Sequence, residues 1–107
     1  MNIKPEKLKT SAALAPMAGV ADRAFRELCM SFGAAYCVGE MASSKGISMR
    51  DKKSSQLLTL SPAERPAGVQ IFGDVPQIMA DAAKLCLEYE PDFIDINMGC
   101  PAPKVAG

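Results

Sequence analysis

The chain has 107 residues, of which 49% are apolar and 22% charged, a composition typical of one folded domain rather than of a disordered segment. Its 12 basic and 12 acidic side chains cancel, so the net charge points neither to a nucleic-acid partner nor to a membrane surface. No apolar run approaches the roughly 20 residues that span a bilayer, and the first residues lack the apolar core of a secretion signal.

Cysteine and histidine usage bears on metals and on the cellular compartment. The four cysteines form no Cys-x-x-Cys pair, and the chain contains no histidine. A zinc site would need widely separated thiolates, so we expect no bound metal and reduced thiols in a cytoplasmic protein.

After a polar lead-in, the chain predicts a strand and then a helix. Residues 11–17 form a small-residue apolar run, and Pro16 marks the point where strand pairing stops. Asp22 predicts the start of the helix and Gly33 its end, with an apolar stripe between them that places Cys29 in the core. The stripe consists of Phe25, Leu28, Cys29 and Phe32.

Residues 34–41 predict the second strand, which closes on a carboxylate. Glu40 either anchors the loop that follows it or belongs to a site, because such strand ends carry functional groups in parallel α/β proteins. Residues 42–60 show the least regular pattern, and their positive charge is either a solvated surface or an edge that contacts nucleic-acid phosphates. The cations are Lys45, Arg50, Lys52 and Lys53. Ser61 and Glu64 then predict one capped helical turn.

Residues 67–73 predict a third strand, in which Gln70 is a lone amide within an apolar run. An unmet buried amide costs about 1–3 kcal/mol, so Gln70 needs either a partner on a neighbouring strand or a ligand with its own donor and acceptor edge. Asp74 and Pro76 then open a helix that Pro91 ends. Its apolar face consists of Val75, Ile78, Met79, Ala82, Leu85, Cys86 and Tyr89.

The fourth strand, over residues 92–97, runs into the turn Gly99-Cys100-Pro101. This places a thiol at the carboxyl end of a strand, where parallel α/β proteins bind ligands. Alternating strands and helices predict parallel βαβ units, and about four units are present, whereas a closed (β/α)₈ barrel has eight. Neither nucleotide-binding fingerprint occurs. We therefore expect an α/β chain that is the first half of something larger.

Four segments of the chain resemble one family, the tRNA-dihydrouridine synthases, which are flavin-dependent reductases of uridine in tRNA. The segments are residues 15–26, 39–41, 69–73 and 95–101, with Lys104-Val105 after the last. The likeness is nearest to the bacterial branch. Four motifs in this order form a specific signal, whereas Gly-Cys-Pro alone would be weak.

The resemblance implies a TIM-barrel catalytic domain that holds FMN at the carboxyl ends of its strands. Residues 1–107 would be the truncated first half of that domain, without the second half and without the helical tRNA-binding domain. The resemblance also assigns roles: FMN contacts to Pro16, Met17, Ala18 and Gln70, the catalytic cysteine to Cys100, and positions near the substrate to Asn97 and Lys104.

By the same resemblance, NADPH or NADH reduces FMN, the flavin delivers a hydride to C6 of uracil, and Cys100 protonates C5. An ordinary thiol, about 3% ionised at pH 7, suits this role as an acid. The target base must leave its stack in the tRNA, at a cost of a few kcal/mol. Full-length members are expected to be monomers. This chain alone, with two unpaired sheet edges, is expected to self-associate, to bind FMN weakly and not to reduce tRNA.

Three other interpretations stay open from the sequence. The chain could belong to another flavin barrel that acts on free pyrimidines, similar to dihydroorotate or dihydropyrimidine dehydrogenase. It could be an RNA-binding remnant in which the basic segment works without flavin. It could also be a truncated product with no function of its own.

Overall fold

We describe residues 12–99 of a computed structural model of the chain. The predicted site residues Cys100 and Lys104 lie outside the described residues, as does the polar lead-in. The elements in chain order are α2 (Arg23–Ser31), β1 (Cys37–Val38), β2 (Ala42–Ser43), α3 (Ser44–Ser48), α4 (Lys52–Leu58), η1 (Pro62–Glu64), β3 (Ala67–Phe72), α5 (Pro76–Cys86), η2 (Leu87–Tyr89) and β4 (Phe93–Ile96), where η denotes a 3₁₀ turn.

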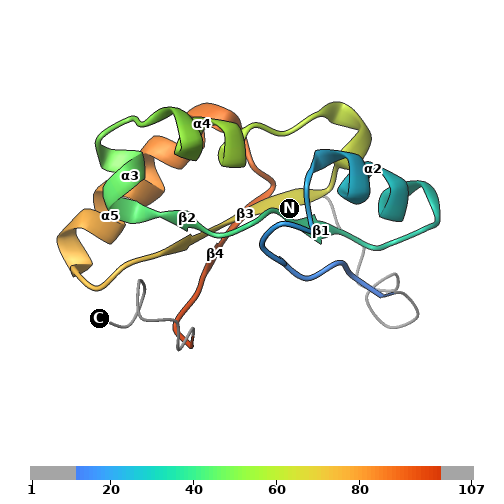
Figure 1. Cartoon of the computed structure of the whole chain (residues 1–107), viewed down its shortest axis with the longest axis horizontal. Coiled ribbons are helices and arrows are strands. Elements are labelled where there is room, and N and C mark those ends of the chain that lie inside the picture. Colours follow the sequence, from blue (N-terminus) through green and yellow to red (C-terminus); the bar gives the residue numbers. More distant parts are fainter. Residues whose placement is uncertain (1–11, 100–107) are drawn as a thin grey trace.

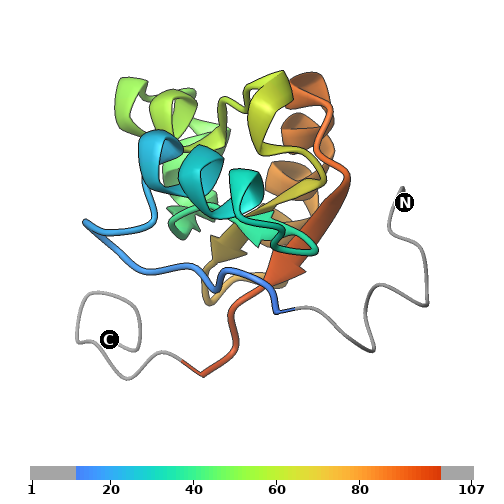
Figure 2. The same ribbon diagram turned by 90° about the vertical axis from the view of Figure 1, so that its right-hand side faces the viewer.

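The strands form one parallel sheet with β3 at its centre. β4 pairs with residues 68–71 of β3, while β1 and β2 pair with residues 67–68 and 71–72. Because Gly68 and Ile71 have partners on both sides, β1 and β2 share one edge of β3 and β4 takes the other. Figures 1 and 2 show the helices gathered on one side of this sheet. The predicted parallel α/β class is confirmed.

The predicted strand 34–41 is interrupted. Val38 pairs with Gly68 and Ala42 with Ile71, so four positions on one strand oppose three on the other. The segment 39–41 therefore holds one extra residue, as in a β-bulge, and this splits the predicted strand into β1 and β2.

The predicted first strand, 11–17, is wrong in its extent. Within the described residues this segment forms only an isolated parallel bridge between Leu14 and Cys37. The Leu14 N–H donates to Tyr36 at 3.1 Å, and the Val38 N–H donates to the Leu14 carbonyl at 3.2 Å. Pro16 has no N–H to continue this ladder, so the backbone leaves the sheet and turns.

The segment 42–60, predicted to be irregular, is mostly helical. Ser43 caps α3, accepting a hydrogen bond from the Gly46 N–H at 3.3 Å, and Asp51 caps α4, accepting from the Ser54 N–H at 2.7 Å. Both are strong N-cap residues, so the sequence did carry a signal for two helix starts. None of the described helices has the length and apolar character needed to cross a membrane.

The core lies between the sheet and the helices. It consists of Ala42, Ile47, Leu58, Val69, Ile71, Ala82 and Cys86. The predicted apolar face of α5 is confirmed in part, because Ala82 and Cys86 are buried and Met79, Leu85 and Tyr89 pack against the core. Its start differs from the prediction, since Val75, which is 43% exposed, occupies the cap position without a side-chain cap bond.

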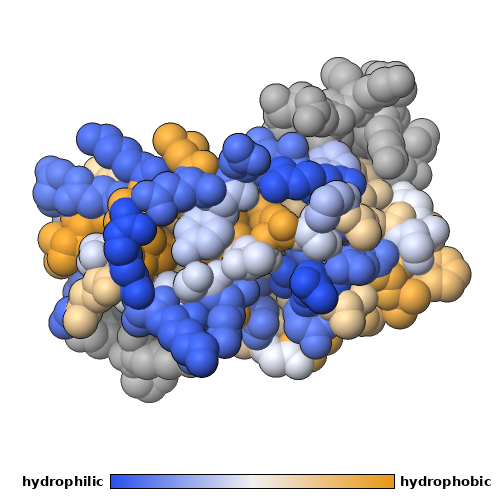
Figure 3. Space-filling model, turned by 90° about the horizontal axis from the view of Figure 1, so that it is seen from above, coloured by the Kyte–Doolittle hydropathy of each residue, from blue (hydrophilic) through white to orange (hydrophobic). Residues whose placement is uncertain are grey.

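The predicted apolar stripe of α2 does not face the core. Asp22 does cap the helix, accepting from the Phe25 N–H at 2.9 Å, but Leu28 is 52% exposed and Phe32 84% exposed. Cys29 is half-buried rather than a core residue. Together with residues 12–14, the stripe borders an apolar hollow at the edge of the sheet. Figure 3 shows apolar surface at this end of the molecule.

The buried residue of α2 is charged. Arg26 is 4% exposed, and its Nε donates to Glu64 Oε1 at 2.7 Å across 38 positions of sequence. Glu64 is fully buried and also accepts from the Ser61 N–H and hydroxyl, which confirms the predicted capping box. This ion pair joins α2 to η1, and no local sequence pattern predicts it.

Candidate ligand cleft on the bare face of the sheet

Side chains alternate along β3 and β4 between the helix-covered face and the bare face. Val69 and Ile71 belong to the core, so Gln70 between them points to the bare face. On β4, Ile94 packs against the core, so Asp95 points the other way. The parallel register places Asp95 directly opposite Gln70. Two polar side chains therefore stand side by side on a face that no described helix covers.

Gln70 bonds to residues of the neighbouring strand and of the segment directly after it. This confirms the first of the two alternatives predicted for its amide, a partner on a neighbouring strand. Its Nε2 donates to Asp95 Oδ2 at 2.6 Å, and its Oε1 accepts from Asn97 Nδ2 at 3.3 Å. Gln70 is 8% exposed, so both bonds form in a largely desolvated place. They use one N–H and one lone pair of the amide, which leaves capacity for a ligand as well.

A turn of small residues borders the amides. The Met17 carbonyl accepts from the Val20 N–H at 3.0 Å and from the Ala21 N–H at 2.8 Å, while Gly19 has a φ of +75° that favours glycine. Glu40, within the bulge, accepts from the Gly19 N–H at 2.5 Å. Glu40 therefore anchors the turn that precedes it in the chain.

These elements enclose an open cleft of about 460 Å³. It is lined by Ala15, Pro16, Ala18, Met41, Gln70, Asn97 and Gly99. The cleft thus brings together four of the seven site residues predicted from the sequence, namely Pro16, Ala18, Gln70 and Asn97. Met17 is 43% exposed and does not line it. Gly99 lines the cleft immediately before Cys100 in the chain.

Met41 is a cleft residue that the sequence reasoning did not single out. Its sulfur accepts a weak hydrogen bond from Asn97 Nδ2 at 3.5 Å. The signal available was its place directly after Glu40, at the end of the predicted second strand.

Aromatic packing closes the other end of the bare face. The rings of Tyr36 and Phe93 meet edge to face, with centroids 5.4 Å apart. Phe93 lies so close to Gly68 that a Cβ built there would stand 2.2 Å from its ring. Glycine at position 68 therefore leaves the space against β3 that the ring of Phe93 occupies.

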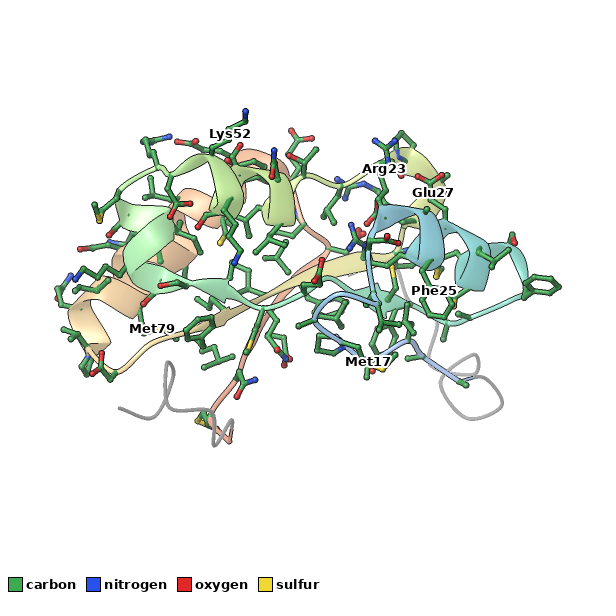
Figure 4. The ribbon with its side chains drawn as sticks, viewed as in Figure 1. Met17, Arg23, Phe25, Glu27, Lys52 and Met79 are labelled. Atoms are coloured by element: carbon green, nitrogen blue, oxygen red, sulfur yellow. The ribbon has the colours of Figure 1, made fainter. Side chains whose placement is uncertain are left out.

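The basic segment lies away from the cleft. Arg50 makes two hydrogen bonds to Glu88, of 3.0 and 2.9 Å, and this exposed pair raises the pKa of Arg50 and lowers that of Glu88. Lys45, Lys52 and Lys53 are exposed on α3 and α4. Figure 4 shows Lys52 on the helix side and Met17 on the opposite side. No described residue that lines the cleft is basic.

The described part of the chain contains no grouping of three or more side chains suited to holding a metal ion. Cys29, Cys37 and Cys86 are free thiols. Burial, with a smaller contribution from the charge of Glu64, raises the pKa of Cys37 to about 11. A buried thiol with such a pKa is a packing group rather than a nucleophile.

A parallel sheet with a cleft beside the ends of its strands is the arrangement of α/β proteins, a class in which ligands commonly bind at the carboxyl side of the strands. The sequence profile of the dihydrouridine synthase (Dus) family matches residues 13–107, and the chain belongs to this family. The resemblance drawn from the four motifs is thereby confirmed.

Several relatives bear the name tRNA-dihydrouridine synthase B. That of Shewanella oneidensis is 50% identical over 105 residues, which cover 98% of this chain and 33% of the relative. Those of Vibrio vulnificus and Pseudomonas aeruginosa are 48% and 44% identical over 105 residues, covering 33% and 32% of their lengths. The chain thus spans about a third of the length of the curated relatives it matches.

Proposed function

We propose that this chain forms part of the FMN-binding catalytic domain of an enzyme that reduces uridine to 5,6-dihydrouridine in tRNA. The observation that carries the proposal is the cleft that joins Pro16, Ala18, Gln70 and Asn97 on the bare face of the sheet. In this proposal the segment around Leu14, the interrupted strand β1–β2, β3 and β4 are the first four strands of a TIM barrel, and the cleft lies at the carboxyl ends of these strands.

The residues of the cleft suit a flat ring with a polar edge. Pro16 and Ala18 present little bulk on one wall, so a planar group can approach the backbone closely. Gln70 and Asn97 offer amide donors and acceptors on the other wall. When bound, FMN would supply the hydride, with NADPH or NADH as the ultimate reductant.

The chain's own contribution to the chemistry is binding, orientation and a proton. Reduction of the C5=C6 bond of uracil adds a hydride at C6 and a proton at C5. Cys100 is proposed to give that proton from its thiol, and its neighbour Gly99 already lines the cleft. Asn97 and Lys104 are proposed to contact the substrate base. To reach the cleft, the uridine must leave the base stack of the folded tRNA.

A chimera tests this proposal. Residues 1–107 replace the matching third of the Shewanella oneidensis synthase, and the protein is produced in a bacterium lacking dihydrouridine synthases. We expect a yellow, FMN-containing protein and dihydrouridine in the tRNA, measured by mass spectrometry of nucleosides. The matched variant Cys100→Ala should retain FMN and lose the product.

Two of the three alternatives predict a different outcome for the chimera. Reduction or oxidation of free pyrimidines without modified tRNA would favour another flavin barrel. Retained tRNA binding by a colourless protein would favour an RNA-binding remnant. Absence of both flavin and tRNA binding from a folded chimera would refute the proposal.

A further inference from the structure

We propose that Asp95 is a positioning residue, which sets the direction in which the amides of the cleft donate and accept hydrogen bonds. This inference rests on the proposed function, because it concerns how the cleft presents itself to a flavin. Asp95 does not line the cleft itself. It lines a neighbouring hollow of about 280 Å³ and accepts a hydrogen bond from Gln70, which does line the cleft.

The carboxylate of Asp95 determines how the Gln70 amide is oriented. An ionised carboxylate accepts hydrogen bonds and cannot donate them. The contact of 2.6 Å between Asp95 Oδ2 and Gln70 therefore requires the NH₂ group of Gln70 to face Asp95. This orientation follows from the chemistry of the pair, whichever way the Gln70 amide is drawn.

The orientation of Gln70 in turn determines that of Asn97. With its NH₂ group toward Asp95, Gln70 turns its oxygen to Asn97, so the NH₂ group of Asn97 must donate at 3.3 Å. The oxygen of Asn97 then faces away and accepts from the Gly99 N–H at 3.1 Å. The charge of Asp95 thus orders a row of hydrogen bonds that ends at Gly99, the residue before Cys100 in the chain.

Met41 supports the same polarity independently. Its thioether sulfur can only accept, and it lies 3.5 Å from Asn97 Nδ2. The NH₂ group of Asn97 thus faces two acceptors, Gln70 Oε1 and the Met41 sulfur. The opposite orientation would place the Asn97 oxygen, an acceptor, against the acceptors Gln70 Oε1 and the Met41 sulfur.

The functional consequence concerns the groups left for a ligand. In the ordered row, Gln70 retains one N–H and one lone pair at fixed positions on the cleft wall. Without the carboxylate, the Gln70 amide can turn over, and the donor and acceptor that meet the polar edge of a flavin exchange places. Asp95 would then determine flavin affinity and spectrum without touching the flavin.

The first test uses the 107-residue chain and needs no flavin. The side-chain amide resonances of Gln70 and Asn97 are recorded by ¹⁵N NMR. We expect one set of signals in the wild type and in Asp95→Glu, and two sets, or strongly shifted ones, in Asp95→Asn. The matched control is Asp81→Asn, which removes a surface carboxylate that accepts from Gln77 at 3.1 Å on α5. It should leave the Gln70 and Asn97 signals unchanged.

The second test places the same substitutions in the chimera. Asp95→Asn should weaken FMN binding on the order of tenfold and shift the absorption bands of the bound flavin, and Asp95→Glu should restore both in part. Unchanged amide signals and unchanged FMN affinity in Asp95→Asn would overturn the inference. If Asp95→Asn does not fold, the wild type and Asp95→Glu still test the inference. Two sets of Gln70 and Asn97 amide signals in either protein would overturn it, because both retain the carboxylate. A wild-type chimera without flavin refutes the proposed function instead, while the NMR test still decides the role of Asp95.

Discussion

The buried ion pair between Arg26 and Glu64 stabilises the turn of small residues beside the cleft, and substitution of Arg26 measures by how much. Both side chains are almost fully buried, at 4% and 0% exposure, and Nε and Oε1 are 2.7 Å apart. Arg26 Nη1 also donates to the Ala21 carbonyl at 2.6 Å, which closes the turn after Ala18. Replacing Arg26 with Met would keep much of the volume and leave the Glu64 carboxylate buried without its cation.

The expected cost follows from that burial. Removing one partner of a buried pair costs about 3–5 kcal/mol, because the other charge stays desolvated and uncompensated. Domains of this size have a free energy of unfolding of about 5–15 kcal/mol, so Arg26→Met should remove about a fifth of it or more. Urea unfolding followed by circular dichroism measures this loss.

Arg23→Met is the matched control, since it makes the same change on the same helix. Arg23 pairs with Glu27 at 3.3 Å but is 66% exposed, so the loss should be about 0–1 kcal/mol. The double variant Arg26→Met with Glu64→Gln should cost less than the sum of the two single changes. Equal costs for Arg26→Met and Arg23→Met, or strict additivity in the cycle, would refute the reasoning.

Three further predictions follow from other contacts. Glu40→Gln should speed amide exchange of Gly19 on the order of tenfold, because a charged acceptor at 2.5 Å is lost, while core amides stay protected. Gly68→Ala should cost about 1–3 kcal/mol in urea unfolding, because the new Cβ meets the ring of Phe93 at 2.2 Å, and Phe93→Leu should recover part of that loss. Cys37 has its pKa raised by burial from 9.0 to about 11, so the folded state binds its proton more tightly than the unfolded state. Its contribution of about 2–3 kcal/mol should be complete below pH 9 and disappear as the pH rises from about 9 to about 11, measured by urea unfolding across that range.

Each of these predictions has a result that contradicts it. Unchanged exchange at Gly19 would mean that Glu40 does not hold the turn. A neutral Gly68→Ala change would mean that the ring of Phe93 can move aside at no cost. Unfolding free energies that do not fall between pH 9 and 11 in the wild type relative to Cys37→Ala would contradict the raised pKa of Cys37.

The sequence predicts well what depends on local periodicity. Alternation along residues 92–97 places Asp95 and Asn97 on one face, and the lone amide of Gln70 indicates the strand beside them. The periodicity of α5 and the capping box at Ser61 and Glu64 depend on neighbours within one or two helical turns, and both are confirmed.

Features that depend on distant contacts escape such reasoning. Periodicity shows that α2 has an apolar stripe but not that Arg26 is the side chain the helix buries, because its partner Glu64 lies 38 positions away. The bulge at 39–41 adds one residue that no strand pattern reveals, yet it accompanies the bond between Glu40 and Gly19. The helices in 42–60 have only 5 and 7 residues, too few for a clear apolar periodicity, so only their caps Ser43 and Asp51 indicate them.

The bare surfaces of the described residues support the proposed half barrel. Parallel sheets are normally covered on both faces, yet here the described helices cover only one face. In addition, apolar side chains are exposed at both edges of the sheet. One surface lies at α2, with Leu28 and Phe32 exposed, and the other lies at the end of β4, where Ile96 is 53% exposed. These are the two edges at which a closing barrel would continue, and the matched relatives are about three times as long as this chain. The predicted self-association of the isolated chain rests on the same two surfaces, since each presents unpaired backbone or apolar area to a second copy.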